Sequence, residues 1–441
     1  MDASTAADRN VRWFLLFRVV FNSRFYYPVM AILFLDLGLS MEQYALLNVA
    51  WAAAIVLLEV PSGAMADLVG RRWLVIFSSC LMLLEMGIFA FTPTGNITLL
   101  FWLFLLNRVV SGAAEAAASG ADEALVYDSL KLAGRENEWP KVLGRLARWQ
   151  SGGFFVAMIL GAAIYDASWV NKTLGWFGIN SQLSAADTVR MPVYLTLVSA
   201  VLAIIAALRL YEPPMPKDKQ VSAGAAFIEV MAAGRWILAT PLALFVILAT
   251  ICNDSFVRLF LTIGTQYYRL IDIPEAVFGI IGSTFALLGY AAPPIANRLI
   301  ATKKPALTFG VVSLTTFAGL WGLQLMIPAW GLVFPMLLGL GMSVMGFATS
   351  YYLNQLAEPS RRATILSFRG LSINLTYGMV GLMFAGLLRA LKSGDAAADE
   401  SVLFVRALGW LPWLFIAAAL VVFAKPLLQR QALVQPTDSP K

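Results

Sequence analysis

The chain contains the stretch Glu59-Val60-Pro61-Ser62-Gly63-Ala64-Met65-Ala66-Asp67-Leu68-Val69-Gly70-Arg71-Arg72-Trp73 between two long apolar segments, Tyr44–Val60 and Trp73–Phe91. Each segment is close to the length of about 20 apolar residues that a helix needs to cross a bilayer. We therefore predict that the stretch is a short, charged turn joining two membrane-spanning helices. Its glycines allow a tight turn, and its arginine pair indicates the cytoplasmic side, where basic residues are retained.

The composition is that of a multi-pass membrane protein. The 441 residues are 59% hydrophobic and 13% charged, whereas a soluble domain carries about 25% charged residues. The net charge is +6, but the basic residues fall in short loops, where they set the topology of the chain. We therefore exclude a water-soluble protein and expect the lipid bilayer, and not a nucleic acid, as partner.

The chain offers little for catalysis. It has no histidine, and its two cysteines, Cys80 and Cys252, both lie inside apolar segments. We therefore expect no metal site and no disulfide framework. No nucleotide-binding P-loop pattern and no nucleophile motif is present, so we expect neither an enzyme nor direct use of ATP.

Twelve apolar spans predict an all-α membrane protein built from two six-helix bundles. The N-terminal bundle covers residues 1–212 and the C-terminal bundle covers residues 240–441. Between them, residues 213–239 form a cytoplasmic linker with an amphipathic helix, because Pro213, Pro214 and Pro216 end the preceding helix. Placing both termini in the cytoplasm puts most Lys and Arg residues on that side. The predicted spans are 11–35, 43–62, 73–91, 97–120, 149–164, 191–210, 241–267, 277–295, 307–327, 331–356, 364–388 and 402–424.

The pattern Gly63-x-x-x-Asp67-x-x-Gly70-Arg71-Arg72 resembles the signature loop between helices 2 and 3 of the major facilitator superfamily of transporters. The resemblance implies two pseudo-symmetric bundles, a monomer, and transport of a small molecule by alternating access. It also implies that these five residues form a conformational latch. Asp122, with Glu123 and Asp128, is expected either to pair with Arg71 or Arg72 or to remain a solvated charge.

Ionisable groups at membrane depth are costly and usually face a cavity or a partner. They concentrate in spans 1, 4 and 7, which line the cavity in the superfamily. Span 1 carries Asn22 and Arg24, and Arg24 either pairs with an acidic residue on a neighbouring helix or binds an anionic substrate group. Span 4 carries Arg108 and Glu115, which share one helical face. Glu115 is either a proton carrier or half of a fixed pair with Arg108.

Glu85 in span 3 is a second acidic candidate, which we expect to fix helix packing. In span 7, Asp254 and Arg258 are four residues apart and can pair along the helix. Protonation of Asp254 would release Arg258 for a substrate. The expected substrate-binding or coupling residues are therefore Asn22, Arg24, Arg108, Glu115, Asp254 and Arg258.

We expect a secondary active transporter that moves a small organic, anionic or amphipathic solute by proton-coupled efflux, as an antiporter in a bacterial inner membrane. The proton is the expected coupling ion, and no other cofactor is expected. Span 5 has Gly152, Gly153 and Gly161 but lacks the Gly-Pro motif of many drug/proton antiporters. The alternatives are uptake or uniport of an anionic metabolite, and a lipid flippase or a non-transporting sensor on the same fold.

Overall fold

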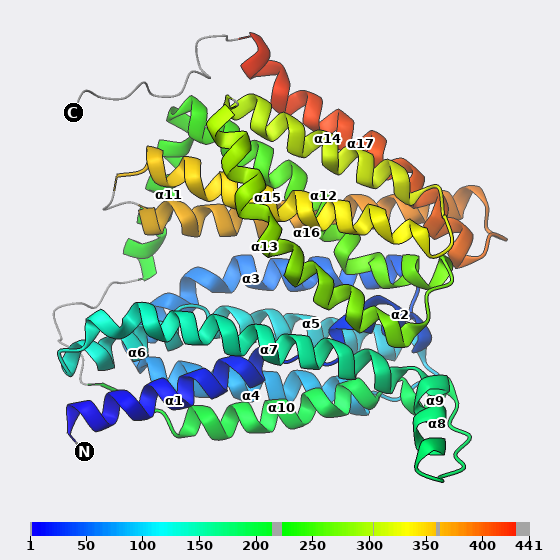
Figure 1. The fold of residues 1–441 in the computed structure, drawn as a ribbon, viewed down its shortest axis with the longest axis horizontal. Coiled ribbons are helices and arrows are strands. Elements are labelled where there is room, and N and C mark those ends of the chain that lie inside the picture. Colours follow the sequence, from blue (N-terminus) through cyan, green and yellow to red (C-terminus); the bar gives the residue numbers. More distant parts are fainter. Residues whose placement is uncertain (1, 214–222, 303, 359–361, 429–441) are drawn as a thin grey trace. The chain divides into compact units, whose positions relative to one another are not determined.

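The computed structural model describes all residues except 1, 214–222, 303, 359–361 and 429–441 (Figure 1). The described part of the chain contains α-helices, short 3-10 helices and no strand, which confirms the predicted all-α class. The α-helices are α1 (Ala3–Asn22), α2 (Met30–Asp36), α3 (Met41–Val69), α4 (Arg71–Phe91), α5 (Ile97–Ala118), α6 (Ala121–Leu132), α7 (Trp139–Tyr165), α8 (Ala167–Trp176), α9 (Ala185–Thr188), α10 (Met191–Leu208), α11 (Ala223–Ala239), α12 (Pro241–Leu270), α13 (Phe278–Thr302), α14 (Pro305–Leu323), α15 (Val333–Leu356), α16 (Arg362–Gly394) and α17 (Glu400–Leu428). The 3-10 helices are η1 (Tyr27–Val29), η2 (Glu136–Glu138), η4 (Glu275–Val277) and η5 (Trp330–Leu332).

The predicted spans correspond to these helices. Within the described ranges, 10 helices are long and apolar enough to cross a membrane. Helix α7, which is followed after a bend of 92° by α8, brings the number to 11. The remaining predicted span is the first, which the structure divides between α1 and α2. The chain is therefore an integral, multi-pass membrane protein with the expected twelve-helix plan.

The first span is interrupted, whereas the sequence pattern predicted one continuous helix. Helix α1 ends at Asn22, and the chain is not helical again until η1 begins at Tyr27. Two side chains close the end of α1: Asn22 Nδ2 donates to Arg18 O over 2.8 Å, and Ser23 Oγ donates to Val19 O over 2.7 Å. Pro28 supplies the physical reason, because it has no N–H to donate to the carbonyl of Arg24, four residues earlier, and its ring would clash with that carbonyl in a continuous helix.

Helix α3 continues through most of the stretch that was predicted to be a turn. It contains Pro61 and runs to Val69, so the turn is reduced to Gly70. Ser62 holds the helix after the proline, because its hydroxyl donates to Glu59 O and to Ala116 O of α5. Gly70 has a φ of 103°, which only glycine adopts without strain.

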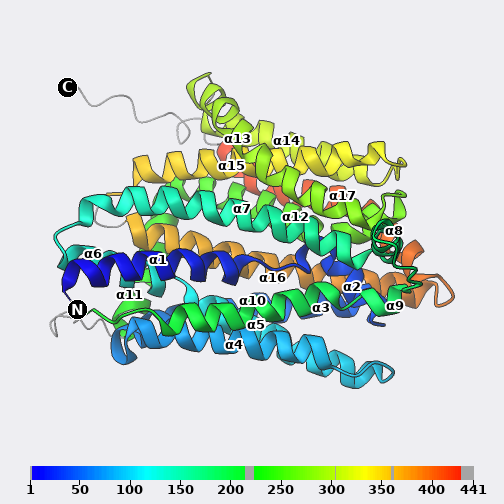
Figure 2. The ribbon, with the colours of Figure 1, turned by 60° about the horizontal axis from the view of Figure 1, so that its bottom comes forward.

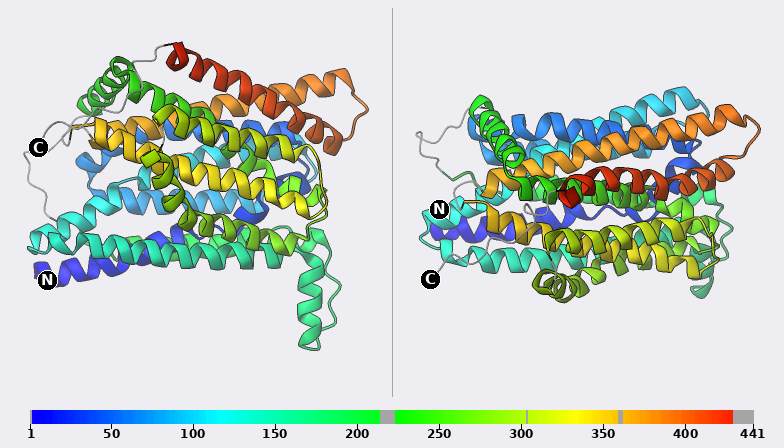
Figure 3. Two further views of the ribbon diagram at one scale, coloured as in Figure 1. Left: turned by 45° about the horizontal axis from the view of Figure 1, so that its top comes forward. Right: turned by 90° about the horizontal axis from the view of Figure 1, so that it is seen from above.

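Two regions predicted as connecting segments also contain helices. The charged stretch between spans 4 and 5 forms α6, η2 and the first turns of α7. The loop predicted between spans 5 and 6 forms α8 and α9, and Figure 3 shows α8 projecting from the end of α7.

The contacts divide the chain into two compact units, each held together by its own helix packing. Unit 1 comprises residues 1–39, 50–227 and 274–283. In it, α1 packs on α6, α7 and α10, and α4 packs on α5 and α10 (Figure 2). Unit 2 comprises residues 40–49, 228–273 and 284–441. In it, α12 packs on α15, α16 and α17, and α14 packs on α15 and α17 (Figure 1).

The units differ from the predicted domain bounds in two short segments. Residues 40–49 group with unit 2, where Tyr44 OH donates to Thr262 O over 3.1 Å. Residues 274–283 group with unit 1, where the N–H of Ala276 donates to Asp166 Oδ2 over 3.2 Å. The predicted linker lies partly outside the described residues. Its described part is α11, and the position of α11 at the membrane surface stays a prediction.

Candidate functional site

Five polar side chains gather inside unit 1, and we call them the Arg24 cluster. They come from the interruption of span 1 and from α4 and α5. One of them is Tyr26, and the four charged members all act on it electrostatically. Buried groups of this kind mark substrate or ion pathways in membrane proteins. The members of the Arg24 cluster are Arg24, Tyr26, Glu85, Arg108 and Glu115.

Glu85 is the centre of the Arg24 cluster. Arg24 Nη1 lies 2.7 Å from Glu85 Oε2, and their side chains are only 2% and 0% exposed. Tyr26 OH donates to the other carboxylate oxygen over 3.3 Å. Of the two roles expected for Arg24, pairing with an acidic residue on a neighbouring helix is the one observed. Because both charges are removed from water, the partners hold each other in place.

Arg108 is buried without a hydrogen-bonding partner. Its residue is 2% exposed, and its guanidinium lies over the ring of Phe34, 5.0 Å from the ring centroid. No hydrogen bond or ion pair joins Arg108 to any other described residue, and its Nε and Nη2 are both buried. Unsatisfied buried donors are costly. The site therefore has the chemistry to accept an anionic group.

Glu115 lies on the same helix as Arg108 but does not pair with it. Seven residues correspond to about 10.5 Å along a helix axis, which is too far for a direct contact. Glu115 is partly buried, and no hydrogen bond or ion pair links it to another described residue. The charged groups that act on it electrostatically are Arg24, Glu85 and Arg18. The predicted alternative of a fixed pair between Glu115 and Arg108 is therefore wrong in this structure.

Asn22 bonds within its own helix, and Asp122 pairs with an arginine other than those expected. The amide of Asn22 is bonded to the carbonyl of its own helix, so it closes α1. Asp122 is 0% exposed and accepts from Arg18 Nη2 over 2.8 Å. The expected pairing of Asp122 with Arg71 or Arg72 is not observed, because α6 packs against α1 and brings Arg18 to the carboxylate.

The arginine pair of the signature stretch is held by Asp128, which was one of its expected partners, and by Glu212, which was not. The side chain of Arg71 pairs with Asp128 on α6. The backbone N–H groups of Arg71 and Arg72 donate to the two carboxylate oxygens of Glu212, over 3.1 and 2.6 Å. The first N–H groups of a helix lack intrahelical partners, and an anion there is also favoured by the helix dipole. Glu212 therefore caps α4.

The other three members of the signature are Gly63, Asp67 and Gly70. Gly63 lies within helix α3, and a Cβ there would contact nothing within 4 Å. A Cβ at Gly70 would lie 3.4 Å from the carboxylate of Glu212. The side chain of Asp67 lies outside the described part of the structure. The latch role of these residues stays a prediction.

Unit 2 holds a smaller charged group on α12. Arg258 donates from Nε and Nη2 to the two oxygens of Asp254, over 2.8 and 3.2 Å. This pair, four residues apart on one helix, is the one that the sequence predicted. The guanidinium of Arg258 also lies 5.9 Å from the ring centroid of Tyr377 on α16. Tyr377 OH is in turn 3.1 Å from the hydroxyl of Thr262.

Arg369 on α16 was not singled out from the sequence. It is partly buried, and the two charged groups that act on it electrostatically are Asp254 and Arg258. Its Nε is buried and has no partner among the described residues. The carboxylate of Asp254 thus interacts electrostatically with two guanidinium groups, those of Arg258 and Arg369. The three residues together carry a net positive charge. An arginine inside a predicted span was the signal that could have identified it.

Three solved transporter structures share the fold of this chain. The nucleoside transporter NupG matches with a TM-score of 0.69 and 14% identity over 95% of this chain and 99% of that chain. A bacterial homologue of the human lysosomal transporter Spinster, in an inward-facing, unoccupied conformation, has a TM-score of 0.67 and 14% identity over 99% of both chains. A mutant of the peptide transporter POT has a TM-score of 0.67 and 13% identity over 98% of this chain and 100% of that chain.

At these identities the likeness shows the fold alone. No curated protein matches the sequence. The family model described as Major Facilitator Superfamily, however, matches residues 12–377, which is most of the chain. Together with the twelve-helix plan, this match shows that the chain belongs to the major facilitator superfamily of transporters.

Proposed function

We propose that the protein is a proton-coupled transporter of a small organic solute that carries an anionic group. One observation supports both parts of the proposal: Arg108 and Glu115 lie on one helix without partners among the described residues, while the neighbouring Arg24–Glu85 pair is closed. A buried guanidinium with free donors fits an anionic group of the solute. A carboxylate without a fixed ion pair can bind and release a proton at lower cost than a paired one.

The roles of the two residues follow from their surroundings. Glu115 lies within electrostatic reach of Arg24, Glu85 and Arg18, so its charge depends on how those groups are arranged. A change in the position of Arg24 would alter the proton affinity of Glu115. Coupling of this kind needs a carboxylate whose neighbours differ between two conformations. We propose that Glu115 carries the proton and that Arg108 binds the solute.

We propose efflux as the direction, so that a proton enters as the solute leaves. The support for this direction is the resemblance of the Arg108-x-x-x-Gly112 pattern to the span-4 motif of antiporters in the family. We further expect a monomer in a bacterial inner membrane, with both termini in the cytoplasm.

The test uses the full chain in proteoliposomes with an entrapped pH-sensitive dye. Anionic, neutral and cationic solutes are added under an imposed pH gradient. An anionic solute should move protons in the wild type, and Glu115→Gln should stop proton movement while exchange of labelled solute continues. If no solute moves protons and no pH gradient drives solute flux, the proposed coupling is wrong.

Two other functions would give different results in the same vesicles. Solute counterflow that does not depend on pH, with unchanged behaviour of Glu115→Gln, would indicate uptake or uniport of an anionic metabolite. Movement of a headgroup-labelled lipid between leaflets, without flux of any soluble solute, would indicate a flippase. The absence of both fluxes would favour a sensor.

A further inference from the structure

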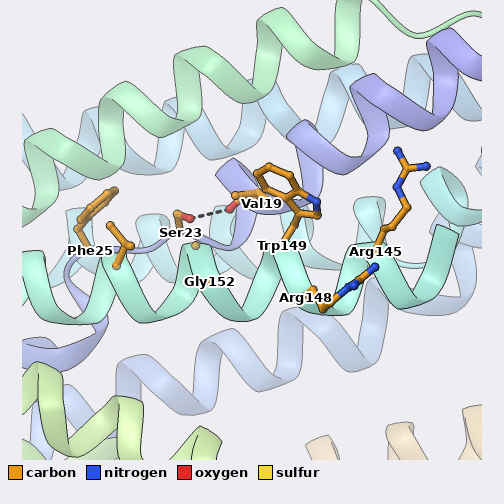
Figure 4. A pocket seen from close by; sticks show the side chains of 9 residues that line it. Val19, Ser23, Phe25, Arg145, Arg148, Trp149 and Gly152 are labelled. Carbon is orange, nitrogen blue, oxygen red and sulfur yellow. Dashed lines mark hydrogen bonds between the residues drawn. The ribbon is translucent and has the colours of Figure 1, made fainter. Parts of the chain in front are cut away.

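A groove lies on unit 1 between α7 and the interruption of span 1. Its volume is about 870 Å³, and all of its lining residues belong to unit 1. Figure 4 shows Arg145, Arg148 and Trp149 at one end of the groove and Phe25 towards the other. The side chains of the Arg24 cluster do not line it, so the groove is separate from the proposed transport site.

The end with the two arginines is strongly basic. Arg145 and Arg148 are both exposed, and no ion pair in the described structure neutralises either of them. The one hydrogen bond from Arg148 runs to the carbonyl of Gly144 on its own helix, over 3.3 Å. The acidic side chain Glu138 acts electrostatically with Arg145, but its carboxylate already accepts two hydrogen bonds from Arg135. The two guanidinium groups are therefore available to an anion.

The rest of the groove is apolar. Trp149 is 64% exposed and Val156 is 51% exposed, so both present hydrocarbon surface. A Cβ added to Gly152 would meet nothing within 4 Å, whereas one added to Gly153 would lie 2.8 Å from Val19. The missing side chain at Gly152 therefore leaves the groove open, and Gly153 allows α1 to approach α7.

The order of these groups along α7 matches the layers of a lipid leaflet. Arg145 and Val156 are separated by 11 residues, or about 16 Å of helix, which is about the thickness of one leaflet's hydrocarbon layer. Trp149 lies next to the arginines, as tryptophans do at the boundary between headgroups and hydrocarbon. In a helix that crosses the bilayer, this order would place the basic end at the level of the phosphates and the apolar part at the level of the acyl chains.

We propose that this groove is a binding site for an anionic phospholipid of the surrounding bilayer. The phosphate-containing headgroup binds Arg145 and Arg148, and one acyl chain lies over Gly152 against Trp149 and Val156. Basic pockets between membrane helices bind anionic headgroups in this way. A free soluble anion would use only the arginines and would leave the apolar floor exposed, which is why a lipid fits better. The site does not depend on the proposed transport function.

The test measures lipid binding to the purified full chain in detergent, by native mass spectrometry and by thermal stabilisation. Phosphatidylglycerol and phosphatidylcholine with the same acyl chains are compared. Two basic residues near a headgroup contribute about 1 kcal/mol each at low salt, so phosphatidylglycerol should bind about 30-fold more tightly. Arg145→Ala/Arg148→Ala should abolish this preference, and Arg145→Lys/Arg148→Lys should retain most of it.

Two exposed glycines of unit 1 give a matched pair for the apolar part. Gly152→Leu should fill the groove and weaken the binding of both lipids by about tenfold or more, on the order of the loss of several buried methylene groups. Gly175→Leu changes an exposed glycine of α8 that does not line the groove and where a Cβ also meets nothing within 4 Å, and should bind as the wild type does. Each variant is first shown to melt as the wild type does without lipid.

Three results would overturn the proposal. The alanine double variant could keep the preference for phosphatidylglycerol, which would place the anion elsewhere. Gly152→Leu could bind both lipids as tightly as Gly175→Leu, which would exclude an acyl chain in the groove. Glycerol 3-phosphate could displace phosphatidylglycerol at equal concentration, which would show that the site recognises a soluble anion and not a lipid.

Discussion

Arg24 and Glu85 form an ion pair, with 2.7 Å between Nη1 and Oε2, in a part of unit 1 that solvent does not reach. The pair connects the interruption of span 1 to the middle of α4. Tyr26 OH donates a hydrogen bond to the same carboxylate, that of Glu85. Since Arg24 is compensated, the free cation of the Arg24 cluster is Arg108 within the described structure, and the free carboxylate is Glu115.

Glu85→Gln should destabilise the protein strongly, because it leaves the Arg24 guanidinium buried without a counter-charge. Removing one partner of a buried pair costs about 3–5 kcal/mol. Unfolding in detergent, followed by heat or by a denaturant, measures the loss. The double variant Arg24→Met/Glu85→Met, which removes both charges, should recover most of the stability. Equal losses in the single and the double variant would contradict a compensated pair.

Glu115→Gln should separate solute movement from proton movement. The amide has nearly the same shape as the carboxylate but does not bind a proton near neutral pH. We therefore expect solute exchange that no longer varies with pH, at a stability within about 1 kcal/mol of the wild type. Exchange rates measured from mildly acidic to mildly alkaline pH report the effect. A pH profile like that of the wild type would assign the proton to another residue.

Arg108→Met should weaken the binding of an anionic ligand and spare a neutral analogue. A hydrogen bond to a charged group contributes about 1.5–3 kcal/mol, which corresponds to a loss of about 10- to 150-fold in affinity. Equilibrium binding of a carboxylate ligand and of its amide measures the difference. Arg108→Lys is the control, since it keeps the charge but loses the planar donor geometry. An equal loss for both ligands would indicate a packing role.

Gly70→Ala should destabilise the turn between α3 and α4, and Gly63→Ala should not. The φ of 103° at Gly70 places an L-residue in a region that costs about 1–3 kcal/mol. Gly63 is helical and has free space for a Cβ, so alanine there should be neutral or slightly stabilising. Thermal unfolding of both variants tests the contrast. Similar melting of the two would mean that the turn does not limit stability.

Asp254→Asn should destabilise unit 2, because it leaves Arg258 and Arg369 as two like charges without a counter-charge. Adding Arg369→Gln to that variant should restore part of the loss. The interaction energy of the cycle should be about 0.5–3 kcal/mol, the range for residues that share a partner. Chemical unfolding of the wild type, the two single variants and the double variant measures it. Additive losses would show that Arg369 is independent of Asp254.

The spacing of apolar residues was sufficient to predict the membrane-spanning helices other than the interrupted first span, because each span must satisfy its own backbone hydrogen bonds in lipid. The Asp254–Arg258 pair could also be predicted, since a separation of four residues brings two side chains together on any helix. Of the partners on different helices, the pair of Arg71 with Asp128 was among those that the family resemblance implied, but spacing along the chain does not identify such partners. The Arg24–Glu85 contact depends on how α4 packs beside the interruption of span 1, and no local pattern encodes that packing.

The local errors have local physical causes. The interruption of span 1 was missed although Pro28 marks it, because apolar residues on both sides gave a continuous hydropathy signal. The end of α3 was placed too early, because Pro61 and Gly63 were interpreted as turn residues although a helix can contain both when a neighbour compensates. Asp122 was paired with the wrong arginine, because the packing of α6 on α1 brings Arg18 closer in space.

The interruption of span 1 has a mechanical consequence. A continuous helix transmits a tilt or a rotation along its whole length as a rigid rod does. The residues between α1 and η1 have no continuous ladder of helical hydrogen bonds, so the rod is interrupted between Asn22 and Tyr27. Arg24 lies on this joint, while Arg18 is fixed to Asp122 on the rigid half. A displacement of α1 would therefore change the position of the Arg18 guanidinium relative to that of Arg24, and both groups act electrostatically on Glu115.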